Sequence, residues 1–286
     1  MKNFAYREAD SKDAILAALA ELKDAYVIAG GTNVMLNILD KKVNDRTLVN
    51  LRNAKELRGI KDNGETITIG ATTTISDLEH SELIAGEAKA LWQAAVSFAD
   101  PTTRHSATVG GNISNASPAA DTATALMVLD AVVTIEKKGA KREVALTDFF
   151  KGVGKTVLAA DEIVTAITFK KSHNCAFIKL GLRNAMAISV ANVAVNLVKQ
   201  GDVVKDIKIA MGSVAPTVRR CAEVEKALLG KKLEDAVIAE AVKGLDKDIS
   251  PIDDIRATGK YRKQVAPVLV TRAIYAACGC KDGGAK

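Results

Sequence analysis

Two runs of small residues constrain this chain of 286 residues more than any other feature. The first run, residues 29–36, reads AGGTNVML, and the second run, residues 108–121, reads TVGGNISNASPAAD. Adjacent glycines permit a positive φ and leave no Cβ in the way, so consecutive backbone N–H groups can converge on one anion. We therefore expect each run to form a backbone cradle for phosphate. Two cradles in one fold suit a ligand with the shape of a dinucleotide.

The neighbours of the first run place it at a junction between a strand and a helix. Residues 26–29 form a short apolar stretch typical of a strand, and residues 34–39 resume with helical spacing. Backbone N–H groups and the positive end of the helix dipole then face one point. The alternative for a Gly-Gly-Thr sequence is a tight turn in which glycine serves geometry alone.

The second run is longer and more specific. Residues 108–117 are mostly small or amide residues, and residues 122–129 have the pattern of an apolar helix. Asn112 and Ser114 offer polar side chains on a backbone that a ligand can approach closely. Asp121 adds a carboxylate where the helix begins, and it either contacts the ligand or complements the helix dipole.

Composition argues against several classes of protein. The net charge is +6, but acidic and basic residues are interspersed and aromatic residues make up only 4%, so we expect no nucleic-acid binding. No run of about eighteen apolar residues predicts a membrane span, and the N-terminus has no apolar signal core, which favours a cytoplasmic location. The four cysteines include no Cys-x-x-Cys pattern; only Cys278 and Cys280 lie close together, so we expect free thiols and no metal.

The sequence contains neither of two common nucleotide-binding motifs, the P-loop and the Rossmann glycine motif. Residues 152–156 read GVGKT, like the end of a P-loop, but Phe149 stands where that motif requires glycine. No Gly-x-Gly-x-x-Gly occurs, so a Rossmann fold is not indicated.

The combination of the two runs resembles the FAD-binding medium subunit of the molybdenum hydroxylases, the family of xanthine, carbon monoxide and nicotinate dehydrogenases. Residues 149–152 with 161–164 resemble the segment that closes the flavin domain in that family. Residues 253–258 with Tyr261 and Arg262 resemble the signature of its C-terminal domain. The resemblance thus covers most of the chain.

The resemblance implies an α+β fold. It consists of a two-lobed FAD-binding domain of the vanillyl-alcohol-oxidase (PCMH) type in residues 1–172, followed by a smaller α+β C-terminal domain in residues 173–286. The lobes are expected at about 1–55 and 56–172. Periodicity agrees, because strands alternate with helices in the first lobe and the sequence becomes rich in strands from Leu57. It also predicts one helix over residues 84–99, and in the C-terminal domain three strands followed by helices over 219–229, 233–242 and 264–278.

The family also implies where FAD binds, namely between the two lobes, with the pyrophosphate on the amides of residues 30–34. Lys179 matches a family lysine near the flavin, where a cation stabilises the anionic reduced form. The alternative role for Lys179 is to protect the edge of a strand against aggregation. Phe98 either covers the flavin ring or belongs to the core. The residues expected to bind the cofactor are Ala29, Gly30, Gly31, Thr32, Asn33, Val34, Thr108, Gly110, Gly111, Asn112, Ser114, Asp121, Val164 and Lys179.

The implied function is that of an electron-transfer subunit in a multi-subunit molybdenum hydroxylase. Electrons pass from iron–sulfur clusters of a partner through FAD to an acceptor such as NAD(P). The implied partners are a large subunit with molybdopterin and a small subunit with 2Fe-2S clusters, and no residue of this chain is expected to be catalytic. Two alternatives stay open: a stand-alone flavin oxidoreductase, which needs an acid–base residue over the flavin, and a nucleotide-binding module without activity.

Overall fold

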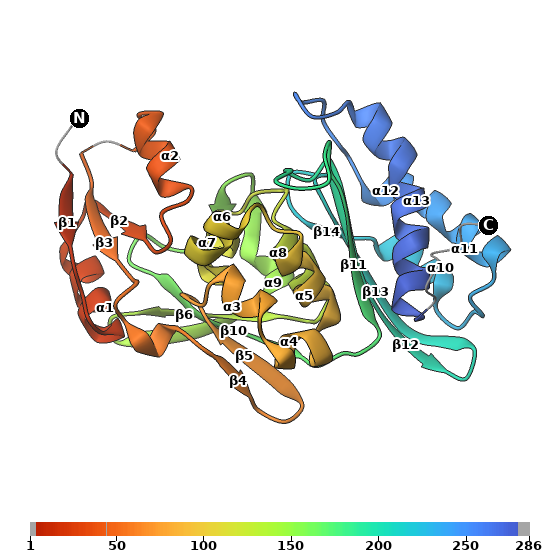
Figure 1. Cartoon of the computed structure of the whole chain (residues 1–286), viewed down its shortest axis with the longest axis horizontal. Helices are drawn as coiled ribbons and strands as arrows, with labels where there is room; N and C mark the ends of the chain where they lie inside the picture. The colour runs from red at the N-terminus through yellow and green to blue at the C-terminus, as the bar shows by residue number, and fades with distance from the viewer. Residues whose placement is uncertain (1–3, 44, 280–286) are drawn as a thin grey trace.

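The computed structural model describes residues 4–43 and 45–279. Three larger β-sheets follow one another along the chain (Figure 1), and a fourth sheet of two short strands, β8 and β9, lies within the second part. We call the parts built on the three larger sheets the first, second and third units. The first unit has a parallel sheet in the order β1-β3-β2. Helix α1 begins at Ser11, whose side chain accepts a hydrogen bond from the amide of Ala14, and it buries one apolar face on this sheet. The elements are β1 (Ala5–Arg7), α1 (Lys12–Glu21), β2 (Ala25–Ile28), α2 (Val34–Leu39) and β3 (Thr47–Asn50).

The second unit has an antiparallel sheet in the order β4-β5-β10-β6-β7, with helices α3 to α9 gathered on one face (Figure 1). Buried side chains such as Ile67, Leu91 and Leu126 form one core between the sheet and these helices. The elements are η1 (Lys55–Leu57), β4 (Ile60–Asp62), β5 (Thr66–Gly70), α3 (Ile75–Glu79), α4 (Glu82–Glu87), α5 (Lys89–Val96), α6 (Pro101–Ser106), α7 (Val109–Ser114), α8 (Asp121–Val128), β6 (Val132–Lys137), β7 (Ala140–Ala145), α9 (Leu146–Phe149), β8 (Phe150–Gly152), β9 (Lys155–Thr156) and β10 (Ile163–Lys170).

The third unit has an antiparallel sheet in the order β11-β12-β13-β14. This sheet lies between α5 and α8 of the second unit on one face and α13 with α10 on the other (Figure 1). The polar residue Asn192 is therefore enclosed where β12 meets α8. The elements are β11 (Cys175–Leu180), β12 (Ala191–Gln200), β13 (Val203–Gly212), β14 (Arg219–Arg220), α10 (Ala222–Leu228), α11 (Asp235–Ala241), η2 (Val242–Gly244), α12 (Leu245–Asp248) and α13 (Gly259–Ala277).

The secondary structure departs from the sequence prediction at several points. The helix predicted over 84–99 is two helices, α4 and α5, because Ala88 leaves the helical conformation and bridges to Ser172. The helix predicted over 219–229 begins only at Ala222, since Arg219 and Arg220 pair with β13. Helix α13 begins earlier than predicted, at Gly259.

Polar contacts fix the first unit on the second. Lys12 on α1 forms an ion pair with Glu136 on β6 at 2.7 Å, and Thr165 on β10 donates to the same carboxylate. This link sets the position of the first run, because α1 and the first run belong to one small unit.

Candidate functional site

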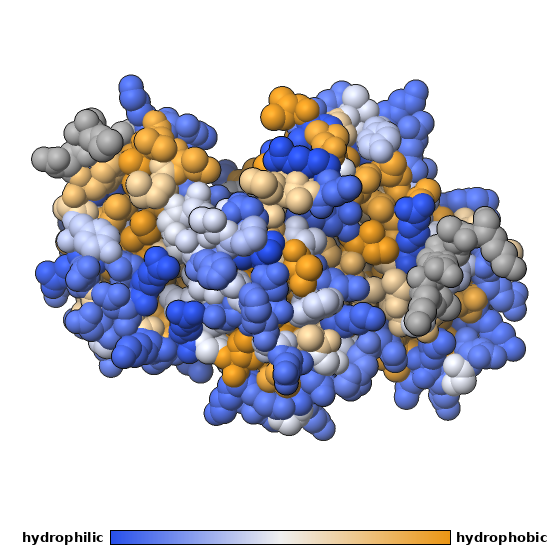
Figure 2. Space-filling model, in the orientation of Figure 1, coloured by the Kyte–Doolittle hydropathy of each residue, from blue (hydrophilic) through white to orange (hydrophobic). Residues whose placement is uncertain are grey.

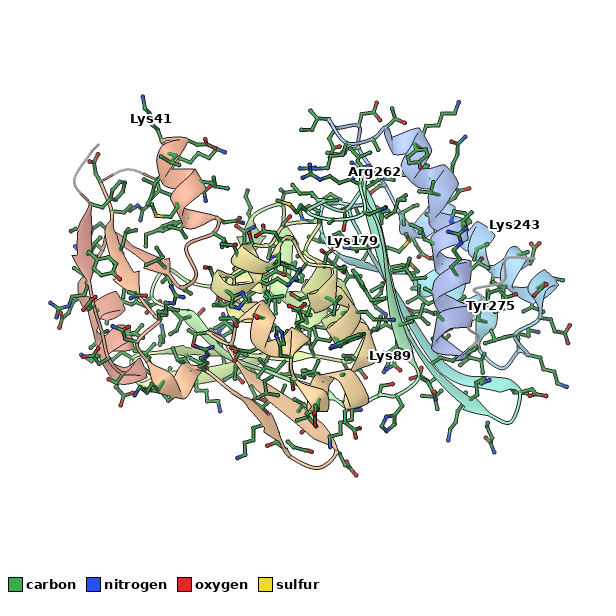
Figure 3. The ribbon with its side chains drawn as sticks, viewed as in Figure 1. Lys41, Lys89, Lys179, Lys243, Arg262 and Tyr275 are labelled. Carbon is green, nitrogen blue, oxygen red and sulfur yellow. The ribbon has the colours of Figure 1, made fainter. Side chains whose placement is uncertain are left out.

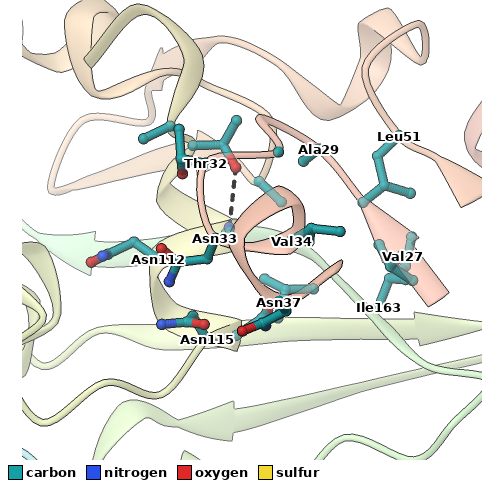
Figure 4. Close-up of a pocket in the computed structure, with 18 of the residues that line it drawn as sticks. Val27, Ala29, Thr32, Asn33, Val34, Asn37, Leu51, Asn112, Asn115 and Ile163 are labelled. Carbon is teal, nitrogen blue, oxygen red and sulfur yellow. Dashed lines mark hydrogen bonds between the residues drawn. The ribbon is translucent and has the colours of Figure 1, made fainter. Parts of the chain in front are cut away.

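Two adjoining cavities lie where the three units meet, beneath a notch visible in the space-filling view (Figure 2). The larger has a volume of about 700 Å³ and lies between the first and second units, with both runs in its lining (Figure 4). The smaller, about 550 Å³, lies between the second and third units. The two adjoin each other, because they share the lining residues Asn33, Phe98, Ala99, Asn112, Asn115 and Ile188.

Almost all the residues predicted to bind the cofactor line this double cavity. The larger cavity contains Ala29, Gly31, Thr32, Asn33, Val34, Thr108, Gly110, Gly111, Asn112, Ser114 and Val164. The smaller contains Asp121 and Lys179. Of the fourteen predicted residues, Gly30 alone lines neither cavity.

The first run has the geometry of a backbone cradle. Gly31 adopts a positive φ of 74°, which favours glycine at this position. Within the described part of the chain, no acceptor receives a hydrogen bond from the amides of residues 30–34, whereas the amide of Met35 donates to Gly31. Unpaired donors beside a cavity are what an anionic group requires.

Gly30 also serves packing between the units, a role that the sequence did not indicate. A Cβ at this position would lie 1.8 Å from the carbonyl oxygen of Ser106. The missing side chain therefore lets the first run pack against the backbone at the end of α6. Its contribution to the site is the close approach of the first and second units.

The second run is not a backbone cradle, contrary to the prediction. Residues 109–114 form the short helix α7, and the protein itself uses their first amides: Val109 donates to Thr73, Gly110 to Ala71, and Gly111 to the side chain of Thr108. Gly110 packs closely against Ala71, and a Cβ at this position would lie 2.6 Å from the Cβ of Ala71, so only glycine fits here. What this run offers the cavity is the exposed face of Gly111 and the side chains of Thr108, Asn112, Ser114 and Asn115.

Asp121 and Lys179 form a buried ion pair on the wall of the smaller cavity. Their side chains are 5% and 10% exposed, and Lys179 Nζ lies 2.6 Å from Asp121 Oδ2. The other carboxylate oxygen, Oδ1, accepts from Ser189 Oγ and Asn192 Nδ2, each at 2.7 Å. Asp121 is thus more than a complement to a helix dipole, and Lys179 is not a solvated lysine at a strand edge.

The third unit completes the smaller cavity with charged side chains near the start of α13. Arg262 is 3% exposed and donates to the carbonyl oxygen of Ser213 and to Asp254, which also accepts from Arg256 (Figure 3). Burial raises the pKa of Asp254, but hydrogen bonds from Arg256 and Arg262 outweigh it and lower the value to about 2. Sequence reasoning cited Arg262 only as a family signature and missed Ser189, Asn192 and Ser213 as site residues.

An apolar wall accompanies these polar groups. Phe98 is partly buried against the core of the second unit and lines both cavities. Val164 lies on β10 at an irregularity in the pairing with β6. Its side chain is 4% exposed and lines the larger cavity. An aromatic side chain at the junction of the cavities suits contact with a planar ring.

The described histidine and cysteine side chains lie outside the lining of the two cavities. His80, His105 and His173 line neither of them. Cys175 and Cys221 are buried thiols, and Cys280 lies outside the described residues. No three potential metal ligands among His, Cys, Asp and Glu come together within residues 4–43 and 45–279.

Both parts of the chain match known protein families. Residues 2–169 match the family described as the FAD binding domain in molybdopterin dehydrogenase, and residues 176–277 match the CO dehydrogenase flavoprotein C-terminal domain. The chain belongs to this family of flavoprotein subunits. The resemblance seen in the two runs is confirmed, as is the predicted α+β fold with a FAD-binding and a C-terminal domain.

Individual relatives match over nearly the whole chain. A putative xanthine dehydrogenase FAD-binding subunit of Escherichia coli K12 is 31% identical over 97% of this chain and 97% of its own. The nicotinate dehydrogenase FAD-subunit of Eubacterium barkeri is 35% identical over 66% of this chain and 67% of its own. A carbon monoxide dehydrogenase structure from Hydrogenophaga pseudoflava superposes with a TM-score of 0.93 at 30% identity, covering 98% of both chains.

The family establishes the cofactor and the class of protein. The cofactor is FAD, and the chain is the FAD-binding medium subunit of a molybdenum hydroxylase and therefore part of an oxidoreductase. The residues present fit FAD, because unpaired amides, an aromatic side chain and a cation line two adjoining cavities. In the part of the chain that the structure describes, no helix is long and apolar enough to cross a membrane.

Proposed function

We propose that FAD occupies both cavities, with its pyrophosphate on the first run and its flavin ring toward the smaller cavity. The observation that carries this proposal is that the two cavities adjoin each other, so that together they reach from the amides of residues 30–34 to the Asp121–Lys179 pair. The second run contributes side chains, chiefly Asn112 and Ser114, and the open face of Gly111. Ala29, Thr108, Gly110 and Val164 shape the wall between the units.

We infer that this chain acts on electrons and not on the substrate that the complex oxidises. Bound FAD supplies the capacity to exchange electrons singly or in pairs. The protein holds the pyrophosphate, covers one side of the ring with Phe98, and places the buried pair of Asp121 and Lys179 nearby. No histidine lines the cavities, and the carboxylates of Asp121 and Asp254 are engaged with Lys179 and with Arg256 and Arg262, which favours a role in electron transfer over acid–base chemistry on a substrate.

The partners follow from the same proposal. Several relatives are named medium chains, for example the carbon monoxide dehydrogenase medium chain of Hydrogenophaga pseudoflava. We propose that this chain assembles with a large molybdopterin subunit and a small 2Fe-2S subunit, receives electrons from the latter, and passes them to an acceptor such as NAD(P). We place its domain boundary near residue 172, between β10 and β11.

The decisive experiment compares the isolated chain, loaded with FAD, with the co-purified complex. Each is assayed with heterocycles and aldehydes in the presence of a dye acceptor, and separately with NADH and the dye. We expect substrate oxidation from the complex alone, and dye reduction by NADH from both preparations. Substrate oxidation by the isolated chain would favour the stand-alone oxidoreductase. A chain purified without flavin absorbance that cannot be reconstituted would refute the placement of FAD.

A NADH control separates the acceptor from the rest of the proposal. If the FAD-loaded chain reduces no dye with NADH or NADPH, while the complex oxidises its substrate with the dye, then NAD(P) is not the acceptor. The role of the chain as the flavin subunit is unaffected by that result.

A further inference from the structure

The buried pair of Asp121 and Lys179 has more partners than an ion pair needs. Asp121 is the first residue of α8, and Lys179 lies on β11. Besides Asp121, Lys179 Nζ donates to the carbonyl oxygen of Ser97 at 3.0 Å. Both oxygens of Asp121 are occupied, one by Lys179 and the other by Ser189 and Asn192. Neither side chain can turn away from the other without losing hydrogen bonds inside the protein.

A second layer fixes this arrangement from behind. Asn192 is fully buried, and its carbonyl oxygen accepts a hydrogen bond from Thr124 on α8 at 2.9 Å. The amide group of Asn192 is therefore oriented with its donor toward Asp121. Asp121 is held as an acceptor at one location, and its negative charge stays next to Lys179.

Stability alone does not account for a pair in this place. Buried ion pairs are often no more stabilising than apolar residues of similar size, because both charges lose their hydration. The pair lies on the cavity wall, while the interface of α8 with the third sheet includes apolar neighbours such as Ala194 and Ala210. Its position points to an effect on what the cavity holds.

We propose that Asp121 and Lys179 act on the flavin as one charge-neutral unit, in which Asp121 sets the flavin reduction potential by cancelling the charge of Lys179. The inference rests on the proposed placement of the flavin ring. A cation near the flavin favours the reduced, anionic form and raises the potential. A carboxylate 2.6 Å from that cation reduces its field to that of a dipole, which falls off faster with distance than the field of a charge.

Removing either partner exposes the full charge of the other, so the two single variants shift the potential in opposite directions. Asp121→Asn leaves Lys179 uncompensated, and the potential rises. Lys179→Met leaves Asp121 uncompensated, and the potential falls. The double variant removes both charges, and its potential returns toward that of the wild-type protein. A purely structural role would shift the two single variants in the same direction or not at all.

The experiment measures the reduction potential of bound FAD in the full chain by anaerobic titration against reference dyes. We expect each single variant to change the ratio of affinities for reduced and oxidised FAD at least tenfold, which for a two-electron couple equals about 30 mV. FAD stoichiometry and melting temperature are recorded for every variant. If Asp121→Asn does not fold, the inference is still tested by Lys179→Met, which should lower the potential, and by the double variant, which should bring it back toward that of the wild type.

A matched control comes from the other end of α8. Lys208 on β13 forms an ion pair with Asp130, just beyond that helix, and neither residue lines a cavity. Lys208→Met therefore removes an ion pair between the far end of α8 and another strand of the same sheet, away from both cavities, and should leave the potential unchanged. The inference would be overturned if the wild type, Asp121→Asn, Lys179→Met and the double variant had equal potentials at full FAD content, or if the two single variants shifted in the same direction. Failure of the wild-type chain to bind FAD would instead refute the proposed function.

Discussion

Gly30→Ala tests whether this glycine is required for packing between units. The new methyl carbon would lie 1.8 Å from the carbonyl oxygen of Ser106, 2.6 Å from its carbonyl carbon and 3.1 Å from the Cα atom of Ala107. Carbon and oxygen atoms in close contact lie about 3.3–3.6 Å apart. The first run and the end of α6 would therefore have to separate by roughly 1.5 Å.

The neighbouring backbone cannot easily give way. The carbonyl oxygen of Ala107 accepts a hydrogen bond from Ile75 at 2.9 Å, and its amide donates to Thr103 at 2.7 Å. Because the clash is with main chain, no change of rotamer relieves it. We expect a loss of about 2–3 kcal/mol in the free energy of unfolding, the upper part of the range for overpacking.

The assay is urea unfolding of the FAD-free protein followed by circular dichroism. With a slope of about 2–3 kcal/mol per molar, the midpoint should fall by about 1 M. Gly86→Ala is the matched control, since a Cβ there meets nothing within 4 Å and the residue lies in helix α4; it should be neutral or stabilising by up to about 1 kcal/mol. An unchanged midpoint for Gly30→Ala would show that the close approach at Ser106 is not what requires glycine.

Three further predictions concern the walls of the site. Gly111→Val should lower FAD affinity at least tenfold in a fluorescence titration. Gly111→Ala contacts the same Thr108 oxygen but fills less of the cavity, so it should lower the affinity less. Equal losses would show that the damage comes from the contact with Thr108, which caps α7, and not from filling of the cavity. Hydrogen bonding to Arg142 lowers the pKa of Glu162 from 4.5 to about 2. In acid-unfolding curves, the stability advantage of the wild type over Glu162→Gln should therefore be complete above pH 4.5 and vanish as the pH falls toward 2. An advantage independent of pH would contradict this. Arg262→Met should cost about 1.5–3 kcal/mol of unfolding free energy in urea, because Asp254 and the carbonyl oxygen of Ser213 each lose a charged donor while Asp254 keeps Arg256. An unchanged unfolding midpoint would refute that expectation.

Local patterns predicted the first unit well. The apolar spacing of residues 34–39 gives α2 with the same bounds, and the stretch over 47–51 gives β3. Both elements are short and flanked by polar or turn-forming residues, so the information that defines them lies within a few residues. The order of the sheets also follows from the alternation of strands and helices along the chain.

The second run shows where local reasoning fails. Two adjacent glycines each cost about 1 kcal/mol in a helix relative to alanine, which favours a loop. The helix α7 forms nevertheless, because Thr108 caps it and Gly110 packs against Ala71 in the second sheet unit. That contact is made by the fold and leaves no sign in the run itself.

The surroundings of Asp121 could be predicted only in part. Its place at the start of a helix follows from the sequence, and the family resemblance assigned both Asp121 and Lys179 to the cofactor site without pairing them. The donors Ser189 and Asn192 come from the third unit, and only the packing of that sheet on α8 brings them to the carboxylate. Polar residues within the apolar stretch 189–197 are the one local signal that could have indicated them.

The smaller cavity has a consequence for the order of events during synthesis. Its lining extends from Asn33 in the first unit to Arg262 in the last helix. Units near the N-terminus fold first as a chain emerges from the ribosome, so the first run is formed long before the opposite wall exists. FAD can therefore be fully enclosed only after translation has passed α13. Any FAD that binds the first two units earlier stays open to exchange on the side that the third unit later covers.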